Sequence, residues 1–251
     1  MEYRNYKELY DALATREDLE RLSETSPYDH ELLMVIYTQR VVKDATKRFY
    51  KVKRHARRLH RQWRNGLSFA RLAQEHRFPP VLMALIVLEG EGISRRRFWK
   101  MLNNLEEVES KRLRRDLREA CEADLIYSPE GTERQYKRGA WGEERLWKWL
   151  RAKGIPFRTE AELRSQFDKT PDALLSEPLV YDGRKVLWIE SKASFGDPLD
   201  VRRHVGRQLR PYVDLFGDGL VVYWFGYVED VDLRLPDGVS ITDGRDFGED
   251  G

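Results

Sequence analysis

Three acidic side chains and one lysine in the C-terminal half of the chain have the types and spacing that metal-assisted hydrolysis needs. Asp172 opens one expected strand, and Glu190 and Lys192 lie two residues apart on the next. Because side chains two residues apart point to the same face of a strand, a hairpin can bring these three groups together. Glu143 shares a face of an expected helix with apolar residues three, four and seven positions later, which turns its carboxylate inward.

Carboxylates that converge in this way repel one another, which raises their pKa values unless a cation lies between them. Hard divalent cations with oxygen ligands suit the arrangement, so Mg²⁺ or Mn²⁺ is the expected cofactor. Such an ion binds carboxylate, phosphate and water oxygens, generates hydroxide and stabilises a leaving oxygen. Lys192 would position the attacking water or neutralise charge that develops on the phosphorus centre.

A purely structural interpretation of the same residues stays open. Asp172 could begin a turn, Glu190 could pair with Lys192 on a solvated strand face, and Glu143 could pair with Lys148 or Lys153 on a helix surface. The apolar flank at residues 186–189 argues against a solvated face.

Two runs of sequence resemble a nuclease signature. The runs KTPD at residues 169–172 and WIESKASFGD at residues 188–197 resemble the PD-(D/E)XK nuclease superfamily. More narrowly, Thr170-Pro171-Asp172 resembles the TPD-motif family, which also carries a helical N-terminal region. The helix at residues 139–154 is similar to that of archaeal Holliday junction resolvases.

This resemblance implies a restriction-endonuclease-like core and a metal-dependent nuclease. It favours DNA as the substrate, with a leaning toward branched or single-stranded forms, and a homodimer is compatible with it because related resolvases act as dimers. The catalytic and metal-binding residues that it implies are Glu143, Asp172, Glu190, Ser191 through its backbone carbonyl, Lys192 and, more weakly, Gln208.

The pattern of apolar residues predicts an α+β chain in two parts. Residues 6–125 have helical spacing with short breaks at 23–27, 65–68 and 78–80, and the pattern changes after 128–131. Domains at 1–130 and 131–251 follow. The second part is expected to hold a helix at 138–153, an extended segment from 155, strands at 172–181 and 185–193 joined by an Asp-Gly turn, a helix at 198–216, a strand at 219–228 and a disordered tail at 244–251.

Composition restricts the class of protein. The chain has 251 residues, 12% of them aromatic, which predicts a folded protein. Its longest apolar run, at residues 81–88, is too short to cross a bilayer, and the N-terminus lacks the apolar core of a signal peptide. An intracellular, cytoplasmic place is therefore expected, or association with the nucleoid in a prokaryote. The single cysteine excludes an intramolecular disulfide and a thiolate zinc cluster.

A basic stretch at residues 43–64 holds ten lysines and arginines and one acid. Such a stretch is typical of a protein that binds a polyanion, here a nucleic acid. The alternative is a solvated helix face balanced by Glu106, Glu107 and Glu109. Eight arginines are expected to contact phosphates. In the basic stretch they are Arg54, Arg57, Arg58, Arg61 and Arg64, and in a second basic segment they are Arg95, Arg96 and Arg97.

Residues 65–88 have the length and the turn of a helix-turn-helix, but the second helix is too apolar to contact base edges. A winged-helix-like core unit without sequence-specific contacts is favoured, and plain helical packing is the alternative. The five histidines show no pairing that indicates a zinc site. His204 lies near the expected catalytic region and could contact phosphate, although a surface position on a helix is favoured.

Two other functions remain open. An inactive nuclease-like core could serve as a DNA-binding or scaffold protein, which the intact set of Glu143, Asp172, Glu190 and Lys192 disfavours. An RNA-processing nuclease would use the same chemistry on another substrate. No protein partner is indicated.

Overall fold

The computed structural model describes residues 1–247, and these form two compact units. Unit 1 contains Met1–Leu13, Arg21–Ile36 and the chain from Lys137 onward, and unit 2 contains Ala14–Glu20 and Tyr37–Tyr136. Three helices hold residues of both units: α2 (Arg16–Thr25), α3 (His30–Lys53) and α9 (Pro129–Ala152). The predicted order of a helical N-terminal region and then a mixed sheet with helices is confirmed. The functional division at residue 130 stays a prediction.

Unit 2 is helical throughout its length, and no strand occurs among residues 14–136. Its remaining helices are α4 (Ala56–Arg64), α5 (Phe69–His76), α6 (Pro80–Glu89), α7 (Arg95–Asn103), η1 (Leu105–Glu107) and α8 (Lys111–Ala123). Three of them begin at serines whose hydroxyls accept a hydrogen bond from a main-chain N–H of the first turn: Ser68 in α5, Ser94 in α7 and Ser110 in α8.

Helix α6 is the core of unit 2. Each residue from Val81 to Leu88 is buried, because α4, α5, α7 and α8 pack around the helix. The buried Asp124 carboxylate accepts a hydrogen bond from Val81 N, so a main-chain N–H group in the first turn of this apolar helix has a partner. The winged-helix-like form that was favoured is wrong, because no strand that could form a wing occurs among residues 14–136, and plain helical packing is present instead. The segment expected to form a helix-turn-helix-like pair is α5 and α6. As expected, its second helix packs in the core and has no face for base edges.

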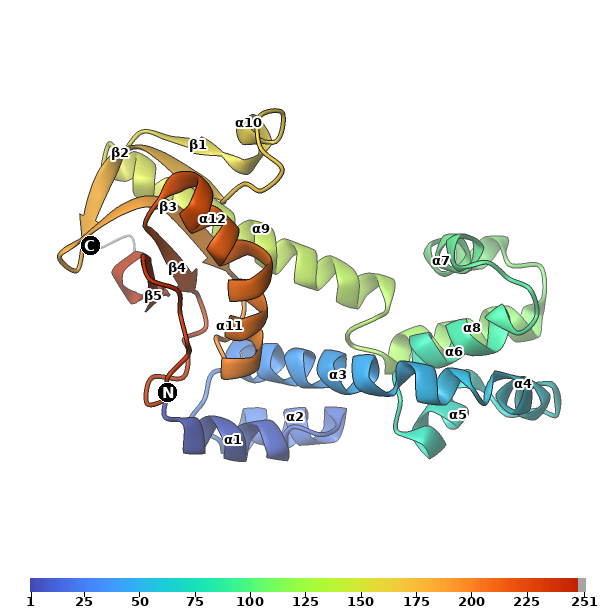
Figure 1. Ribbon diagram of the computed structural model, residues 1–251. Coiled ribbons are helices and arrows are strands. Elements are labelled where there is room, and N and C mark those ends of the chain that lie inside the picture. Colours follow the sequence, from blue (N-terminus) through green and yellow to red (C-terminus); the bar gives the residue numbers. More distant parts are fainter. Residues whose placement is uncertain (248–251) are drawn as a thin grey trace. The chain divides into compact units, whose positions relative to one another are not determined.

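Unit 1 is built on a five-stranded mixed sheet with the order β1-β2-β3-β4-β5 (Figure 1). Strands β1 (Phe157–Thr159), β2 (Ala173–Tyr181) and β3 (Arg184–Lys192) pair antiparallel, whereas β4 (Gly219–Tyr223) and β5 (Val239–Asp243) continue parallel to β3. The other elements are α1 (Tyr3–Ala12), α10 (Glu160–Leu163), α11 (Pro198–His204), η2 (Val205–Leu209), α12 (Arg210–Phe216) and η3 (Gly244–Phe247).

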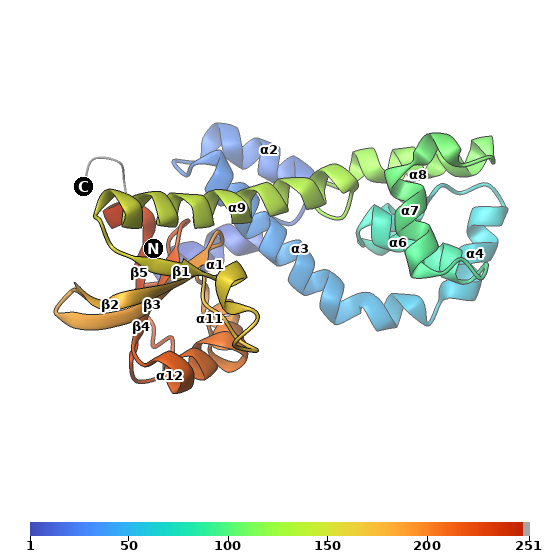
Figure 2. The same ribbon diagram turned by 90° about the horizontal axis from the view of Figure 1, so that it is seen from above.

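Helices cover the two faces of this sheet (Figure 2). Leu146 and Leu150 of α9 pack on one face with Leu220 and Val222. Helices α11 and α12, with η2 between them, pack on the other face, where Trp188 lies buried. Alternate residues of β4 serve the two cores, as period-2 geometry requires.

Helix α1 belongs to unit 1, although the sequence pattern placed it in the N-terminal region. The Tyr6 ring stacks on Phe195 with centroids 5.2 Å apart, and Leu9 and Leu13 are buried with it. This assignment depends on contacts across nearly the whole chain, which helical periodicity alone does not reveal.

Several boundaries differ from the prediction. Helix α9 begins at Pro129 and not near residue 138, because Ser128 Oγ accepts from Gly131 N and Pro129 occupies the first turn. The expected helix 198–216 is interrupted by the π-helical segment η2. Strand β4 ends at Tyr223 rather than residue 228.

The C-terminal part differs from the prediction in a further strand and in the start of the tail. Strand β5 was not predicted, because it is short and follows a long loop. Of the tail expected to be disordered, Gly244–Phe247 forms η3, since the Phe247 ring packs 4.7 Å from Trp149. Residues 248–251 lie outside the described residues. Within the described chain, no helix is long and apolar enough to cross a membrane.

Candidate active site

A tight hairpin aligns the motif residues. Asp182 and Gly183 both have positive φ, 48° and 72°, which is the backbone of a type I′ turn, and Tyr181 pairs with Arg184 across it. The predicted Asp-Gly hairpin is therefore confirmed. A register irregularity between Leu174 and Leu179 then places Asp172, directly before β2, beside the end of β3 where Glu190 and Lys192 lie.

Main-chain groups hold Asp172 in place. Its Oδ2 atom accepts a hydrogen bond of 2.7 Å from Ser191 N, and its carbonyl accepts one of 3.0 Å from Trp147 Nε1 on α9. Burial and the charge of Glu190 raise the pKa of Asp172 well above its ordinary value. The carboxylate thus lies at a point where removing negative charge, or adding a cation, is favourable.

Glu190, Lys192 and Gln208 form a buried polar network. Lys192 Nζ donates to Glu190 Oε1 at 2.5 Å and to Gln208 Oε1 at 2.9 Å, and Gln208 Nε2 donates to Glu190 Oε1 at 3.3 Å. The side chains of Lys192 and Glu190 are only 15% and 4% exposed. The pair that the structural interpretation expected is present, but it is not on a solvated face.

The second oxygen of Glu190 has no partner. Glu190 Oε2 is buried, and no hydrogen bond to it is formed within the described residues. A buried carboxylate oxygen without a donor costs free energy, on the order of a few kcal/mol for a charged group. The arrangement is therefore incomplete by itself, and a cation next to this oxygen would complete it.

Glu143 reaches the same region from α9. A Cβ atom at Gly142 would lie 2.7 Å from Trp224 Nε1 and 3.0 Å from Ser191 Oγ, so the missing side chain lets α9 approach the strands closely. Glu143 is half-buried and forms no ion pair or hydrogen bond within the described chain. Burial, and then the charges of Glu160 and Glu190, raise its pKa. Its neighbour Glu144 is exposed and lies 3.8 Å from Arg151.

The structure thus brings the five residues that were predicted to be catalytic into one region. Mutual electrostatic influence connects the three carboxylates with Lys192, and hydrogen bonds connect Lys192 with Gln208. Among residues 1–247, however, no three histidine, cysteine, aspartate or glutamate side chains stand close enough together to form a metal cage. The roles of these residues stay predictions. The five residues are Glu143, Asp172, Glu190, Lys192 and Gln208.

The arginines predicted to contact phosphates lie in unit 2 and divide into two groups. Arg64 and Arg95 are paired, with Glu91 and Glu89 respectively. The remaining six are exposed, and their guanidinium groups form no ion pair or hydrogen bond within the described chain. They are Arg54, Arg57, Arg58, Arg61, Arg96 and Arg97. Glu106, one of the expected balancing acids, pairs instead with Arg114 and Arg118.

His204 lies on α11 at the edge of the candidate site. Its Nδ1 atom is 2.7 Å from the Tyr223 hydroxyl, and the two rings are stacked. Burial, and then the charge of Lys192, lowers the pKa of His204 to about 4. The side chain is therefore neutral and partnered near pH 7, which disfavours a phosphate contact.

We expect the free energy of unfolding to fall as the pH drops from about 6.5 to about 4 because of His204. Its pKa is lower in the folded protein, so the unfolded chain takes up the proton first and acid favours unfolding. The loss amounts to up to about 3 kcal/mol for this group. Urea unfolding across this pH range measures it. His204→Gln should lack this component and His55→Gln, at an exposed position, should keep it; equal pH profiles for wild type and His204→Gln would contradict the assignment.

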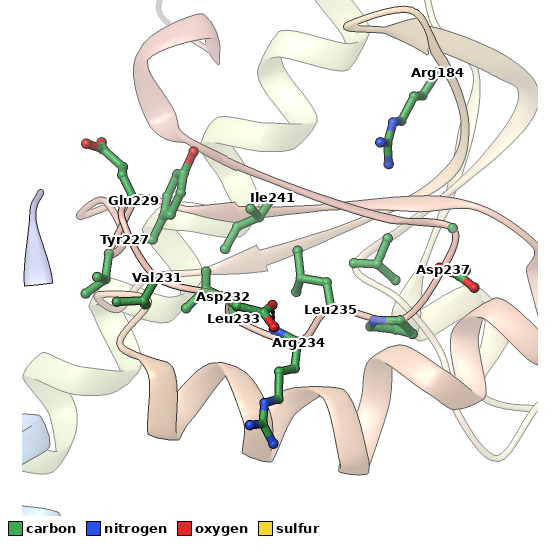
Figure 3. A pocket seen from close by; sticks show the side chains of 14 residues that line it. Arg184, Tyr227, Glu229, Val231, Asp232, Leu233, Arg234, Leu235, Asp237 and Ile241 are labelled. Atoms are coloured by element: carbon green, nitrogen blue, oxygen red, sulfur yellow. Dashed lines mark hydrogen bonds between the residues drawn. The ribbon is translucent and has the colours of Figure 1, made fainter.

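A shallow pocket of about 470 Å³ elsewhere in unit 1 has no part in this site (Figure 3). It is lined by the loop between β4 and β5, from Tyr227 to Gly238, together with Arg184, Val239 and Ile241. None of the candidate catalytic residues contributes to its lining.

Comparison of the chain with known protein families finds one whose sequence motif includes the Thr170-Pro171-Asp172 run. The family model described as "Protein of unknown function TPD sequence-motif" matches residues 109–245, more than half of the chain. The chain belongs to the TPD sequence-motif family. The Thr170-Pro171-Asp172 run of this TPD protein is the segment that ends at the candidate site, with the Thr170 carbonyl accepting from the Tyr212 hydroxyl at 2.7 Å.

Curated relatives carry the name CDAN1-interacting nuclease 1. The zebrafish (Danio rerio) protein is 33% identical over 181 residues, which are 69% of this TPD protein and 60% of the relative. The human (Homo sapiens) protein is 31% identical over 178 residues, 68% of this chain and 63% of the relative. The chain therefore spans less than two thirds of the length of these relatives. No solved structure matches it.

Some residues that shape the site of this TPD protein were not found by motif reasoning. Gly142 and Trp224 set the approach of α9, and Trp224 Nε1 donates to Ser191 Oγ at 2.7 Å. Exposed arginines of α11 and η2 also lie near the network, since Arg203 and Arg207 affect the pKa of His204. The glycine directly before Glu143 is the one signal in the sequence that could have indicated close helix packing.

Proposed function

We propose that this protein is a metal-dependent nuclease of the PD-(D/E)XK type that hydrolyses phosphodiester bonds in DNA inside the cell. The observation that carries the proposal is the buried, unpartnered Glu190 Oε2 atom, next to a lysine that is held at a fixed position. The names of the curated relatives support a nuclease.

The donor set fits a divalent cation. Asp172 and Glu190 offer carboxylate oxygens, Ser191 offers its backbone carbonyl, and Glu143 lies close enough to be affected by the Glu190 charge. Mg²⁺ is usually held by one or two carboxylates, with water and substrate phosphate in the other positions, so a complete cage of side chains is not required. Mn²⁺ accepts the same ligands.

The chain's own groups have distinct tasks in this mechanism. When bound, the metal ion lowers the pKa of a water molecule and offsets charge on the phosphate. Lys192 Nζ, held by Glu190 and Gln208, donates a hydrogen bond to the attacked phosphate group. Ser191 N fixes the Asp172 carboxylate, and Glu143 would add a third carboxylate from the α9 side.

The free arginines of unit 2 support a polyanionic substrate. Arg54 lies in the turn between α3 and α4, and α4 carries Arg57, Arg58 and Arg61; no described acid neutralises these four. Contacts of this kind go to phosphates, so they supply affinity without base sequence preference. The burial of α6 is consistent with this mode, because it removes the helix that would otherwise contact bases.

Replacing both Arg57 and Arg58 with glutamine should weaken binding to duplex DNA of any sequence. Each lost phosphate contact lowers the dependence of log K on log salt by about 0.9, so the slope should fall by roughly 2. Fluorescence anisotropy in EDTA over a salt series measures it. The matched control is Arg71→Gln with Arg118→Gln, because these exposed arginines are already paired with Glu75 and Glu106. An unchanged slope would remove these residues from the interface.

The function itself is tested by digestion of labelled single-stranded, duplex, flap and four-way-junction DNA, with matched RNA hairpins, in Mg²⁺, Mn²⁺ or EDTA. Metal-dependent cleavage of DNA is the expected result. Cleavage of RNA alone would favour an RNA-processing nuclease. Binding without cleavage under each condition would favour a scaffold with an inactive core.

A further inference from the structure

An exposed tryptophan lies on the helix that also carries Glu143 of the candidate active site. Trp141 lies on α9, and 43% of its surface is accessible to solvent, although tryptophan is usually buried. Its ring is held by packing against two aromatic rings. The centroid of the Trp224 ring lies 5.7 Å away in an edge-on arrangement, and that of Phe225 lies 6.0 Å away. An aromatic side chain that is both held and open offers a ready surface for stacking.

A cation reinforces this arrangement. The Arg145 guanidinium lies 5.5 Å from the Trp141 ring centroid and 5.2 Å from that of Trp224, and Arg145 Nε donates to the Phe247 carbonyl at 3.2 Å. The positive charge is thus fixed among the aromatic rings. A ligand that combines a flat ring with negative charge would suit both features.

The position of Trp141 relative to the proposed chemistry is set by its neighbours in the chain. The next residue, Gly142, packs against Ser191, whose carbonyl is a proposed metal ligand, and the residue after that is Glu143. Trp224, which contacts the Trp141 ring, donates to Ser191 Oγ. Residues two apart on a helix point to different sides, so the Trp141 ring does not share the side of Glu143, and its link to the candidate site runs through Trp224 and Ser191.

We propose that Trp141, supported by Trp224, Phe225 and Arg145, stacks an unpaired nucleobase of a bound nucleic-acid strand. Within a continuous duplex both faces of each base are already stacked, so the substrate class is single-stranded or locally unpaired nucleic acid. Base stacking on aromatic side chains tolerates any sequence. The inference rests on the proposed nuclease function for the class of ligand, a nucleic acid, whereas the stacking contact itself requires no hydrolysis.

Binding in EDTA tests the contact separately from cleavage. The probes are a labelled oligothymidylate and a blunt DNA duplex of equal length, measured by anisotropy with wild type, Trp141→Ala and Trp141→Phe. Since one stacked base contributes about 1–3 kcal/mol, Trp141→Ala should bind the single strand about tenfold or more weakly, with duplex affinity unchanged. Trp141→Phe should recover most of the loss. Leu215→Ala, at a position that is 50% exposed on α12, is the control.

A second measurement uses the unaltered protein. Photo-crosslinking of an oligothymidylate that contains 5-iododeoxyuridine, followed by peptide mapping, should place the crosslink on Trp141. A crosslink on Tyr50, another exposed aromatic residue, would overturn the proposal. Absence of binding to the single strand, or an equal loss on both probes in Trp141→Ala, would also overturn it. Stacking without any cleavage would instead overturn the nuclease function and leave the contact established.

Discussion

Replacing Glu190 with glutamine should lower the rate of phosphodiester hydrolysis by about 1000-fold or more. The substitution keeps the size of the side chain but removes the negative charge, so a divalent cation loses a ligand whose second oxygen has no other partner. It also weakens the ion pair that holds Lys192 Nζ 2.5 Å from Glu190 Oε1. Loss of both effects corresponds to about 4 kcal/mol of transition-state stabilisation.

The rate is measured by single-turnover cleavage of the best DNA substrate in saturating Mg²⁺ or Mn²⁺. Glu177→Gln, on an exposed position of β2, is the matched control and should cleave at the wild-type rate. For the variant Glu143→Gln on α9, the matched control is Glu144→Gln at the next position, which is exposed. Equal rates for wild type and Glu190→Gln would exclude Glu190 from the chemistry.

Metal binding can be measured for the same pair of proteins without any substrate. A ligand that binds only the folded state raises the melting temperature, by an amount equivalent to about 1.4 kcal/mol at ten times its dissociation constant. Mn²⁺ should therefore raise the melting temperature of the wild type by a few degrees and leave that of Glu190→Gln unchanged. Identical shifts in both proteins would place the ion elsewhere.

Gly142→Ala should both destabilise the protein and reduce its activity, although alanine is the better helix former. The added Cβ would overlap Trp224, which cannot move aside because it is 8% exposed and its Nε1 atom donates to Ser191 Oγ. Overpacking of this kind costs about 1–3 kcal/mol. Relief of the overlap requires α9 to move away, which withdraws Glu143. A displacement on the order of 1 Å lowers activity by roughly 100-fold.

Gly139→Ala on the same helix is the control, since a Cβ there would meet no atom within 4 Å. It should stabilise the protein by about 0.5–1 kcal/mol, because glycine is unfavourable inside a helix. Urea unfolding and single-turnover cleavage of both variants give the comparison. If Gly142→Ala were as stable and as active as Gly139→Ala, the close approach of α9 would not matter for the site.

Local chemistry made the β2–β3 hairpin predictable. Asp182-Gly183 selects one turn type, the turn sets the register next to it, and alternation along β3 places Glu190 and Lys192 on one side. Each step depends on neighbours within a few residues. The approximate position of the helix that carries Glu143 followed in the same way, from apolar spacing and the glycine at its end. The irregularity between Leu174 and Leu179, which shifts the register and brings Asp172 beside Glu190, was not predicted.

Other features depend on contacts between distant residues and could not be predicted. Helix α1 joins unit 1 through Tyr6 and Phe195, and Phe247 is ordered by Trp149 and Trp224. Strand β5 is specified by its pairing with β4 rather than by its own short pattern. In unit 2, only the folded structure distinguishes a paired arginine such as Arg64 from a free one such as Arg57, because both look alike in a basic run.

The sequence by itself determined which groups are present for hydrolysis, and it determined the hairpin and the common side of Glu190 and Lys192, because turn chemistry and strand periodicity act over short distances. Only the folded structure decided the register shift between Leu174 and Leu179 that aligns Asp172 with Glu190. Tertiary structure decided how closely Glu143 approaches, through the contact of Gly142 with Trp224 and Ser191. It also decided that Gln208 holds Lys192 and that Glu190 Oε2 stays buried without a partner. These features arise where separate elements pack together, and burial there sets both the pKa values and the need for a cation.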